Sequence, residues 1–205
     1  VILGAANQTD AYVIFGGATG QTGGDVISLV NAGQGVRING LAEDIGLGSR
    51  VTGVGDFNGD GFADVAMVGN NADSNSVARI IYGRNTSGTI NVSTAASASS
   101  GFGIDASIGT GFGDRIDKIS GAGDMNGDGL ADLMVAGFNL ANYQGWTYVV
   151  YGSTNASNLT LNGSIAASRG FLLQGNALGE GLSTAGDFNG DGLDDLILGF
   201  GSNAN

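Results

Sequence analysis

The sequence predicts an all-β fold of three consecutive four-stranded antiparallel repeats, and three observations support this prediction. An acidic string occurs three times, as DFNGDGFAD at 56–64, DMNGDGLAD at 124–132 and DFNGDGLDD at 187–195. Short runs rich in Val, Ile, Leu and Tyr are bounded by Gly, Asn, Asp and Ser, which is typical of β-strands. Forty glycines and no proline favour many tight turns between such strands.

The acidic string marks a repeating unit. Its first Asp falls at positions 56, 124 and 187, so successive copies are 68 and 63 residues apart. An apolar run that ends in an aromatic residue and Gly follows two of the strings, as ARIIYGR at 78–84 and TYVVYGS at 147–153, and YVIFGG at 12–17 is a third copy. We therefore divide a single repeat domain, 1–205, into units at approximately 5–69, 70–137 and 138–200.

Each unit holds enough apolar runs for about four strands. Four strands per unit at this period are typical of a propeller blade, and no apolar stripe of helical period is present. A helical solenoid is therefore excluded, and a sandwich would not repeat its sequence in this way. In the first full unit we expect strands near 49–55, 64–69, 77–83 and 101–105, with a further short strand at 89–93 and a loop at 93–100.

The repeated string has the composition of a metal-binding loop. Positions 1, 3, 5 and 9 carry side-chain oxygens, position 7 offers a backbone carbonyl, and Gly at position 6 allows a sharp turn. Calcium takes six to eight oxygen ligands, and closely packed carboxylates repel one another without a cation. Magnesium is disfavoured because it prefers a tight octahedron and retains its waters. Zinc is disfavoured because the chain has no His and no Cys.

Two other interpretations of the string carry less weight. An EF-hand loop needs Glu at position 12 between two helices, whereas position 12 here is Met67, Val135 or Leu198 in an expected strand. Asn-Gly-Asp-Gly alone indicates a turn, but all three copies keep a final Asp that no turn requires. The sequence therefore predicts three calcium sites, and three equivalent sites in a repeat favour a structural role over a signalling one.

These residues resemble the FG-GAP repeat family, found in the β-propeller of integrin α subunits and in bacterial surface proteins. The Phe-Gly element is intact at 112–113 and becomes Leu-Gly at 47–48 and 178–179, while the Pro of the family pattern is absent throughout. The resemblance implies a four-stranded blade with calcium in the loop between its first two strands. It implies as ligands Asp56, Asn58, Asp60, Phe62 (backbone oxygen) and Asp64; Asp124, Asn126, Asp128, Leu130 (backbone oxygen) and Asp132; and Asp187, Asn189, Asp191, Leu193 (backbone oxygen) and Asp195.

The resemblance also implies a ring of about seven blades, which three repeats cannot close. We therefore expect part of a larger or multi-chain β-propeller-like assembly, because open strand edges at both ends would be adhesive.

Composition excludes several function classes. The net charge of −12 argues against nucleic acid and anionic membrane surfaces, and no apolar run is long enough to span a membrane. The absence of His and Cys removes the usual catalytic triads and thiol nucleophiles, so we expect no enzyme activity. The acids outside the strings are expected to be solvated turns or supports for the metal loops: Glu43, Asp44, Asp114, Asp117 and Glu180.

These inferences together predict an extracellular or cell-surface calcium-binding module for adhesion or for interaction with a protein or glycan ligand. Millimolar extracellular calcium suits sites of modest affinity. Two alternatives remain: a self-assembling fibre or surface-layer subunit that binds further copies of itself, and an accessory propeller of an enzyme whose catalytic domain lies elsewhere. We expect Trp146 and Tyr143 to pack in the core or at a blade edge. Glycosylation and chance are equally good explanations of six Asn-x-Ser/Thr sequons, which begin at Asn7, Asn85, Asn91, Asn155, Asn158 and Asn162.

Overall fold

A computed structural model describes most of the chain. The described residues are 1–4, 10–17, 24–40, 45–70, 75–92, 100–106, 115–138, 144–176 and 178–201. Within these ranges the chain forms fifteen strands and one short helix, which confirms the prediction of an all-β fold. Several predicted features lie outside the described residues: residues 93–99 of the loop expected at 93–100, the Phe-Gly element at 112–113, and Glu43, Asp44, Asp114, Tyr143 and Asn7.

The strands form four sheets, which we number in chain order. The first sheet has the order β1-β2-β3-β7, with β1 at Ile2–Gly4, β2 at Asp10–Ile14, β3 at Gly35–Asn39 and β7 at Gly88–Asn91. The second has the order β12-β8-β6-β5-β4, with β12 at Leu159–Leu161, β8 at Gly101–Ala106, β6 at Ser76–Ile81, β5 at Asp64–Asn70 and β4 at Ile45–Gly55. The third has the order β13-β11-β10-β9, with β13 at Gly170–Asn176, β11 at Gln144–Val150, β10 at Asp132–Phe138 and β9 at Ile116–Gly123. The fourth pairs β14 (Leu178–Gly186) with β15 (Asp195–Phe200).

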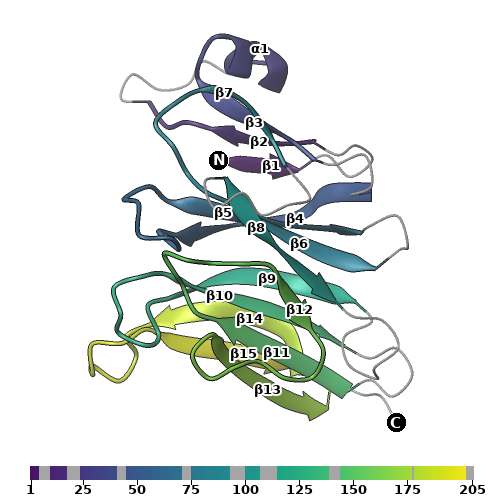
Figure 1. Cartoon of the computed structure of the whole chain (residues 1–205), viewed down its shortest axis with the longest axis vertical. Coiled ribbons are helices and arrows are strands. Elements are labelled where there is room, and N and C mark those ends of the chain that lie inside the picture. Colours follow the sequence, from purple (N-terminus) through teal and green to yellow (C-terminus); the bar gives the residue numbers. More distant parts are fainter. Residues whose placement is uncertain are drawn as a thin grey trace.

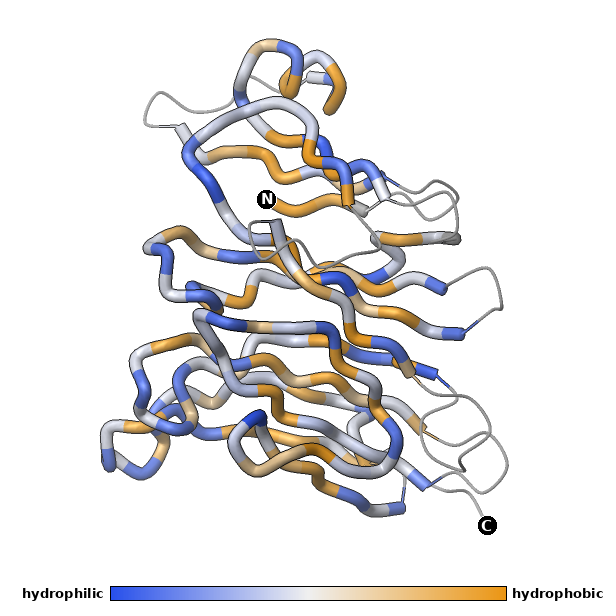
Figure 2. Tube along the Cα trace, viewed as in Figure 1, coloured by the Kyte–Doolittle hydropathy of each residue, from blue (hydrophilic) through white to orange (hydrophobic). Residues whose placement is uncertain are grey.

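The four sheets stack face to face in chain order; in Figure 1 the first is at the top, the second lies below it, and the third and fourth overlap at the bottom. Strand β4 contacts both β1 and β9, and β9 also contacts β14. A hydrophobic cluster fills each of the three spaces between successive sheets. The stack therefore has a layered core, and apolar residues recur along every layer in Figure 2.

The central strands of the second and third sheets are apolar on both faces because each of these two sheets packs against two neighbours. In β5, Ala66 and Val68 face the cluster shared with the third sheet, whereas Met67 faces the cluster shared with the first. Successive side chains of a strand point to opposite faces, so burial of both faces requires a continuous apolar run. This explains why the runs that follow the first two acidic strings do not alternate with polar residues.

The strands expected in the first full unit are confirmed. Strands β4, β5, β6 and β8 match the four main predictions to within a few residues, and β7 matches the further short strand. The third sheet also has the expected four antiparallel strands.

The prediction of three four-stranded antiparallel units holds only in part for the described residues. The second sheet has five strands and the fourth has two. Strand β7 lies between β6 and β8 in the chain but pairs in parallel with β3 of the first sheet. Strand β12 likewise leaves its chain neighbours and pairs in parallel with β8 of the second sheet. Each crossover ties one sheet to the preceding one by backbone hydrogen bonds.

The sequence pattern did not predict helix α1, Val26–Asn31. The Asp25 side chain caps it by accepting hydrogen bonds from the backbone N–H groups of Ile27 and Ser28. None of its residues is buried, and with six residues it is too short for a helical period to be recognised in the sequence. Separately, no helix within the described part of the chain is long and apolar enough to cross a membrane.

Candidate metal centre: three acidic hairpin loops

The three acidic strings form hairpin loops that project from the same side of the stack, at the left of Figure 1. Loop 1 (56–64) joins β4 to β5, loop 2 (124–132) joins β9 to β10, and loop 3 (187–195) joins β14 to β15. All fifteen residues predicted as calcium ligands therefore lie in these loops, and the last Asp of each string is the first residue of the following strand.

The first Asp of each string organises its loop. In loop 1, one carboxylate oxygen of Asp56 accepts hydrogen bonds from the backbone N–H groups of Gly59 (2.7 Å) and Asp60 (3.1 Å). The other oxygen accepts one from the backbone N–H of Gly61 (2.8 Å). Asp124 and Asp187 accept the same three bonds in loops 2 and 3. These bonds fold the backbone around the carboxylate, as Asp side chains do in tight turns.

The two glycines within each string permit this fold. Gly59 and Gly61 have φ values of +78° and +87°, a region that other residues rarely adopt. The equivalent glycines of loops 2 and 3 share this conformation: Gly127, Gly129, Gly190 and Gly192.

The last Asp of loops 1 and 2 is buried. Asp64 is 1% exposed and accepts the backbone N–H groups of Phe57 (2.9 Å) and Gly83 (2.7 Å), one on each oxygen. Asp132 is 0% exposed and accepts those of Met125 and Gly152, both at 2.9 Å. A carboxylate held in this way cannot move far without breaking two hydrogen bonds.

Burial is costly for these two carboxylates. Desolvation raises the pKa of Asp64 to about 6, backbone hydrogen bonds oppose this rise, and the nearby Asp60 and Asp56 charges add to it. The pKa of Asp132 rises to about 6 for the same reasons, with Asp128 and Asp124 as the neighbouring charges. Loops 1 and 2 therefore each hold a buried carboxylate beside two further acidic side chains.

No cationic side chain among the described residues offsets this charge. The ion pairs there join Arg37 to Asp10, Arg79 to Asp105, and Arg50, Arg115 and Lys118 to Asp117; none includes a loop carboxylate. Asp117 lies in strand β9 with these ion pairs, not in the solvated turn that the sequence allowed.

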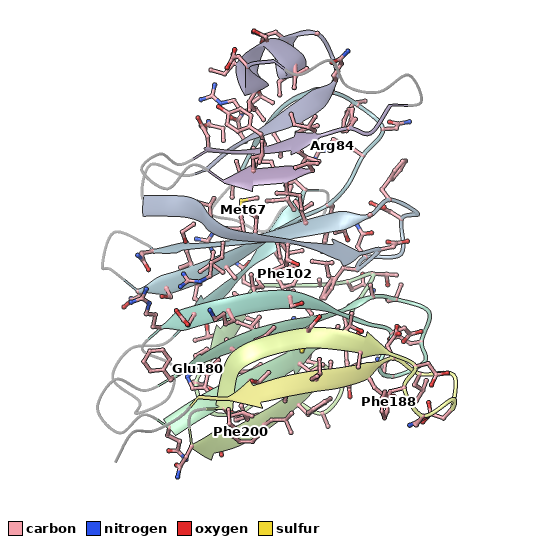
Figure 3. All side chains as sticks on the ribbon, turned by 180° about the vertical axis from the view of Figure 1, so that it is seen from behind. Met67, Arg84, Phe102, Glu180, Phe188 and Phe200 are labelled. Atoms are coloured by element: carbon pink, nitrogen blue, oxygen red, sulfur yellow. The ribbon has the colours of Figure 1, made fainter. Side chains whose placement is uncertain are left out.

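Loop 3 has the same turn as loops 1 and 2 but lacks the neighbouring residues that bury those two loops. Asp195 accepts hydrogen bonds from Phe188 and Asn189 on one oxygen, with no counterpart of Gly83 or Gly152 among the described residues. Phe188 is 86% exposed, whereas Phe57 at the same loop position is fully buried against Phe102, with ring centroids 5.4 Å apart. Figure 3 shows Phe188 at the outer end of the stack and Phe102 inside it.

Gly83 and Gly152 are site residues that the sequence analysis missed. Each follows the aromatic residue at the end of the repeated apolar run, and each donates to the last Asp of a loop. A Cβ on Gly152 would lie 2.7 Å from the Ala131 carbonyl oxygen, and one on Gly83 would overlap that of Ala63. The repeated Tyr-Gly pair was the signal that could have identified them.

The donor chemistry of the loops fits a hard cation. At the predicted ligand positions each loop offers three Asp side chains, one Asn side chain and a backbone carbonyl, without nitrogen or sulfur ligands. In the described conformation the Asp oxygens accept backbone N–H groups, and no three acidic side chains in the described residues are grouped so as to hold a metal ion. Calcium accepts this donor set because it tolerates variable coordination, whereas magnesium requires a near-ideal octahedron.

Other predicted residues fall outside this site. Trp146 is buried in the core between the second and third sheets, with its ring centroid 5.5 Å from that of Tyr148, which confirms core packing. Glu180 is exposed on β14. The Asn158 side chain accepts the Gly103 backbone N–H, and the Asn91 side chain accepts a hydrogen bond from Asn39.

No family model matches this chain, and no curated protein matches it either.

Proposed function

We propose that each loop binds one calcium ion and that calcium stabilises the stacked sheets as an extracellular or cell-surface β-propeller module. The observation that carries this proposal is the burial of Asp64 and Asp132 beside other carboxylates without a cationic partner in the described residues. A divalent cation would remove this repulsion, and three would change the net charge from −12 to about −6.

In this proposal the sheets are FG-GAP-type blades that belong to a larger or multi-chain propeller. The third sheet supports it, because it has four antiparallel strands and carries its acidic loop between its first two strands in chain order. The module would present a rigid face to a protein or glycan ligand for adhesion. Calcium has a structural role in this proposal, and the chain itself performs no catalysis.

The first test is thermal unfolding of this chain in excess calcium, in excess magnesium and in chelator. A ligand that binds only the folded state at 100 times its Kd stabilises that state by about 2.7 kcal/mol per site. We expect a large rise in Tm with calcium and a much smaller one with magnesium. Equal Tm values in calcium and chelator would reject the proposal.

Self-assembly is a second candidate function, supported by the exposed fourth sheet. Ile197 and Phe200 on β15 are 61% and 68% exposed, and Phe188 of loop 3 is also exposed (Figure 3). Apolar residues on a two-stranded sheet favour pairing with further copies of the chain. Molar mass in solution, measured in calcium and in chelator, separates the candidates, because a fibre or surface-layer subunit should keep growing with concentration, whereas a multi-chain propeller should stop at the mass of a closed ring.

A further inference from the structure

Consecutive acidic loops are joined by direct backbone hydrogen bonds. The N–H of Ala131, the eighth residue of loop 2, donates to the carbonyl of Asp56, the first residue of loop 1 (2.9 Å). The N–H of Asp194, the eighth residue of loop 3, donates to the carbonyl of Asp124, the first residue of loop 2 (3.1 Å). The three loops therefore form a ladder in which each loop holds the first residue of the preceding one.

Glycine at the residue before each string permits this close approach. A Cβ on Gly55 would lie 2.7 Å from the Ala131 side chain, and one on Gly123 would overlap the Asp194 carboxylate. Both glycines also have positive φ, at +96° and +74°. In loop 3 the equivalent Gly186 has no atom within 4 Å of its Cβ position, so no further loop contacts it in the described residues.

Asp194 makes the contact between loops 3 and 2 different from the contact between loops 2 and 1. The eighth residue is Ala63 in loop 1 and Ala131 in loop 2, but it is Asp194 in loop 3. The Asp194 carboxylate accepts the backbone N–H of Asp124 at 2.8 Å. Asp194 therefore holds both backbone polar groups of Asp124, by a donor and an acceptor, whereas Ala131 provides Asp56 with a donor alone.

Asp194 is placed to transmit the state of loop 3 to loop 2. It directly precedes Asp195, the last candidate ligand of loop 3, and it fixes Asp124, the first candidate ligand of loop 2. A cation that orders Asp195 would also restrict Asp194, and a fixed Asp194 would position Asp124. Its carboxylate also adds negative charge beside loop 2, which favours a bound cation.

We propose that Asp194 couples loops 2 and 3, so that cation binding in loop 3 strengthens cation binding in loop 2. This inference rests on the proposed binding of calcium by the loops. Coupling between sites is reciprocal, so filling loop 2 must strengthen loop 3 by the same factor. Asp194 is a positioning residue here and not a ligand, because its carboxylate oxygen Oδ2 is engaged by the Asp124 N–H of the neighbouring sheet.

The test follows each loop separately during a titration of the ¹⁵N-labelled chain with calcium chloride. The glycine at position 6 of each string provides an amide signal for its own loop: Gly61, Gly129 and Gly192. The Asp194→Ala variant gives loop 3 the residue that loops 1 and 2 already have. We expect the calcium midpoint at Gly129 to rise about tenfold, a change that corresponds to about 1.4 kcal/mol, while the midpoint at Gly61 stays constant.

A second variant tests the coupling by weakening cation binding in loop 3 and following loop 2. Asp187→Asn replaces a candidate carboxylate ligand of loop 3 with a neutral amide, which should weaken cation binding there, and leaves the sequence of loop 2 intact. We expect it to raise the Gly129 midpoint in the wild-type background but not in the Asp194→Ala background, because the connection is already absent there. If Asp194→Ala fails to fold, Asp194→Asn replaces it, and a smaller rise at Gly129 is then expected.

The outcomes separate this inference from the proposed function. Calcium-dependent shifts at all three glycines, with an unchanged Gly129 midpoint in the Asp194 variant, would overturn the coupling and leave calcium binding in place. Absence of any shift at the three glycines of the wild-type chain would overturn both. A rise at Gly61 equal to that at Gly129 would also overturn the coupling, because the effect would then be general.

Discussion

Loops 2 and 3 have almost the same sequence but different surroundings. In loop 2, Asp132 is fully buried and accepts a hydrogen bond from Gly152, which follows β11 of the same sheet. In loop 3, Asp195 is only partly buried and accepts hydrogen bonds from its own loop alone among the described residues. The string itself therefore determines the turn, whereas the neighbouring strands determine how deeply its charge is buried.

This difference matters because a bound cation should stabilise the folded chain more where the carboxylates are buried. An exposed carboxylate is solvated by water and loses little without a metal, while a desolvated one beside like charges is destabilised. Loop 1 resembles loop 2 in this respect, since Asp64 is also buried. We therefore expect loops 1 and 2 to contribute most of the calcium-dependent stability and loop 3 to contribute least.

The largest predicted difference concerns the aromatic residue at position 2 of the string. Phe57 of loop 1 is fully buried, and Phe188 of loop 3 is 86% exposed. Phe57→Ala should lower the free energy of unfolding by about 3–5 kcal/mol, because it leaves a cavity beside Phe102. Phe188→Ala should change it by less than about 0.5 kcal/mol. Denaturant unfolding in saturating calcium measures both changes in the free energy of unfolding. Equal losses for the two variants would contradict the contrast between the buried surroundings of loop 1 and the exposed surroundings of loop 3.

The local geometry of the loops could be predicted from the sequence, because its determinants lie within nine residues. The Asp56 side chain accepts hydrogen bonds from Gly59, Asp60 and Gly61, which belong to the same string. The strands could also be predicted from the sequence, since apolar runs bounded by turn residues indicate them directly. The continuous apolar character of β5 also agrees with burial on both faces.

What the sequence did not reveal depends on pairing between distant residues. The Asp124 N–H reaches Asp194, 70 residues further along the chain, and Gly152 reaches Asp132 across 20 residues. By its place in the chain, strand β7 would belong with β6 and β8, but it pairs in parallel with β3. Periodicity identifies a strand and its faces but not its partner, so these contacts could not be derived from the pattern.

The second prediction compares the last Asp of the two loops. Asp132→Ala removes the acceptor of two buried N–H groups as well as a candidate ligand. We expect a loss of about 3 kcal/mol in saturating calcium, since each unsatisfied buried group costs roughly 1–3 kcal/mol. Asp195→Ala should cost about 1 kcal/mol or less, because water can replace the lost acceptor. A larger loss for Asp195→Ala in the same unfolding assay would reverse the proposed ranking.

The third prediction concerns the glycine that supports loop 2. Gly152→Ala places a Cβ 2.7 Å from the Ala131 carbonyl oxygen and the Leu130 side chain, so the strand or the loop must shift. We expect a loss of about 1–3 kcal/mol and a weaker calcium response at the Gly129 amide. Gly16→Ala is the matched control, because Gly16 ends the first copy of the same element and its Cβ position has no atom within 4 Å. Equal stabilities of the two variants would show that Gly152 tolerates a side chain.

The smallest predicted effect is the pH dependence of the calcium-free chain. Burial raises the pKa of Asp64 and Asp132 to about 6 in the folded state, above the ordinary value of 3.8. Between these pKa values the folded chain binds more protons than the unfolded chain, so the free energy of unfolding should rise as the pH falls from 7.5 to 5. Saturating calcium should weaken or reverse this trend, because protons compete with the cation for the same carboxylates.

Thermal unfolding in chelator across this pH range measures the slope, and the Asp64→Asn/Asp132→Asn double variant should flatten it. A wild-type Tm that falls towards pH 5 in chelator would show that these two carboxylates are not destabilised by burial, which would remove the main physical reason for a cation in loops 1 and 2.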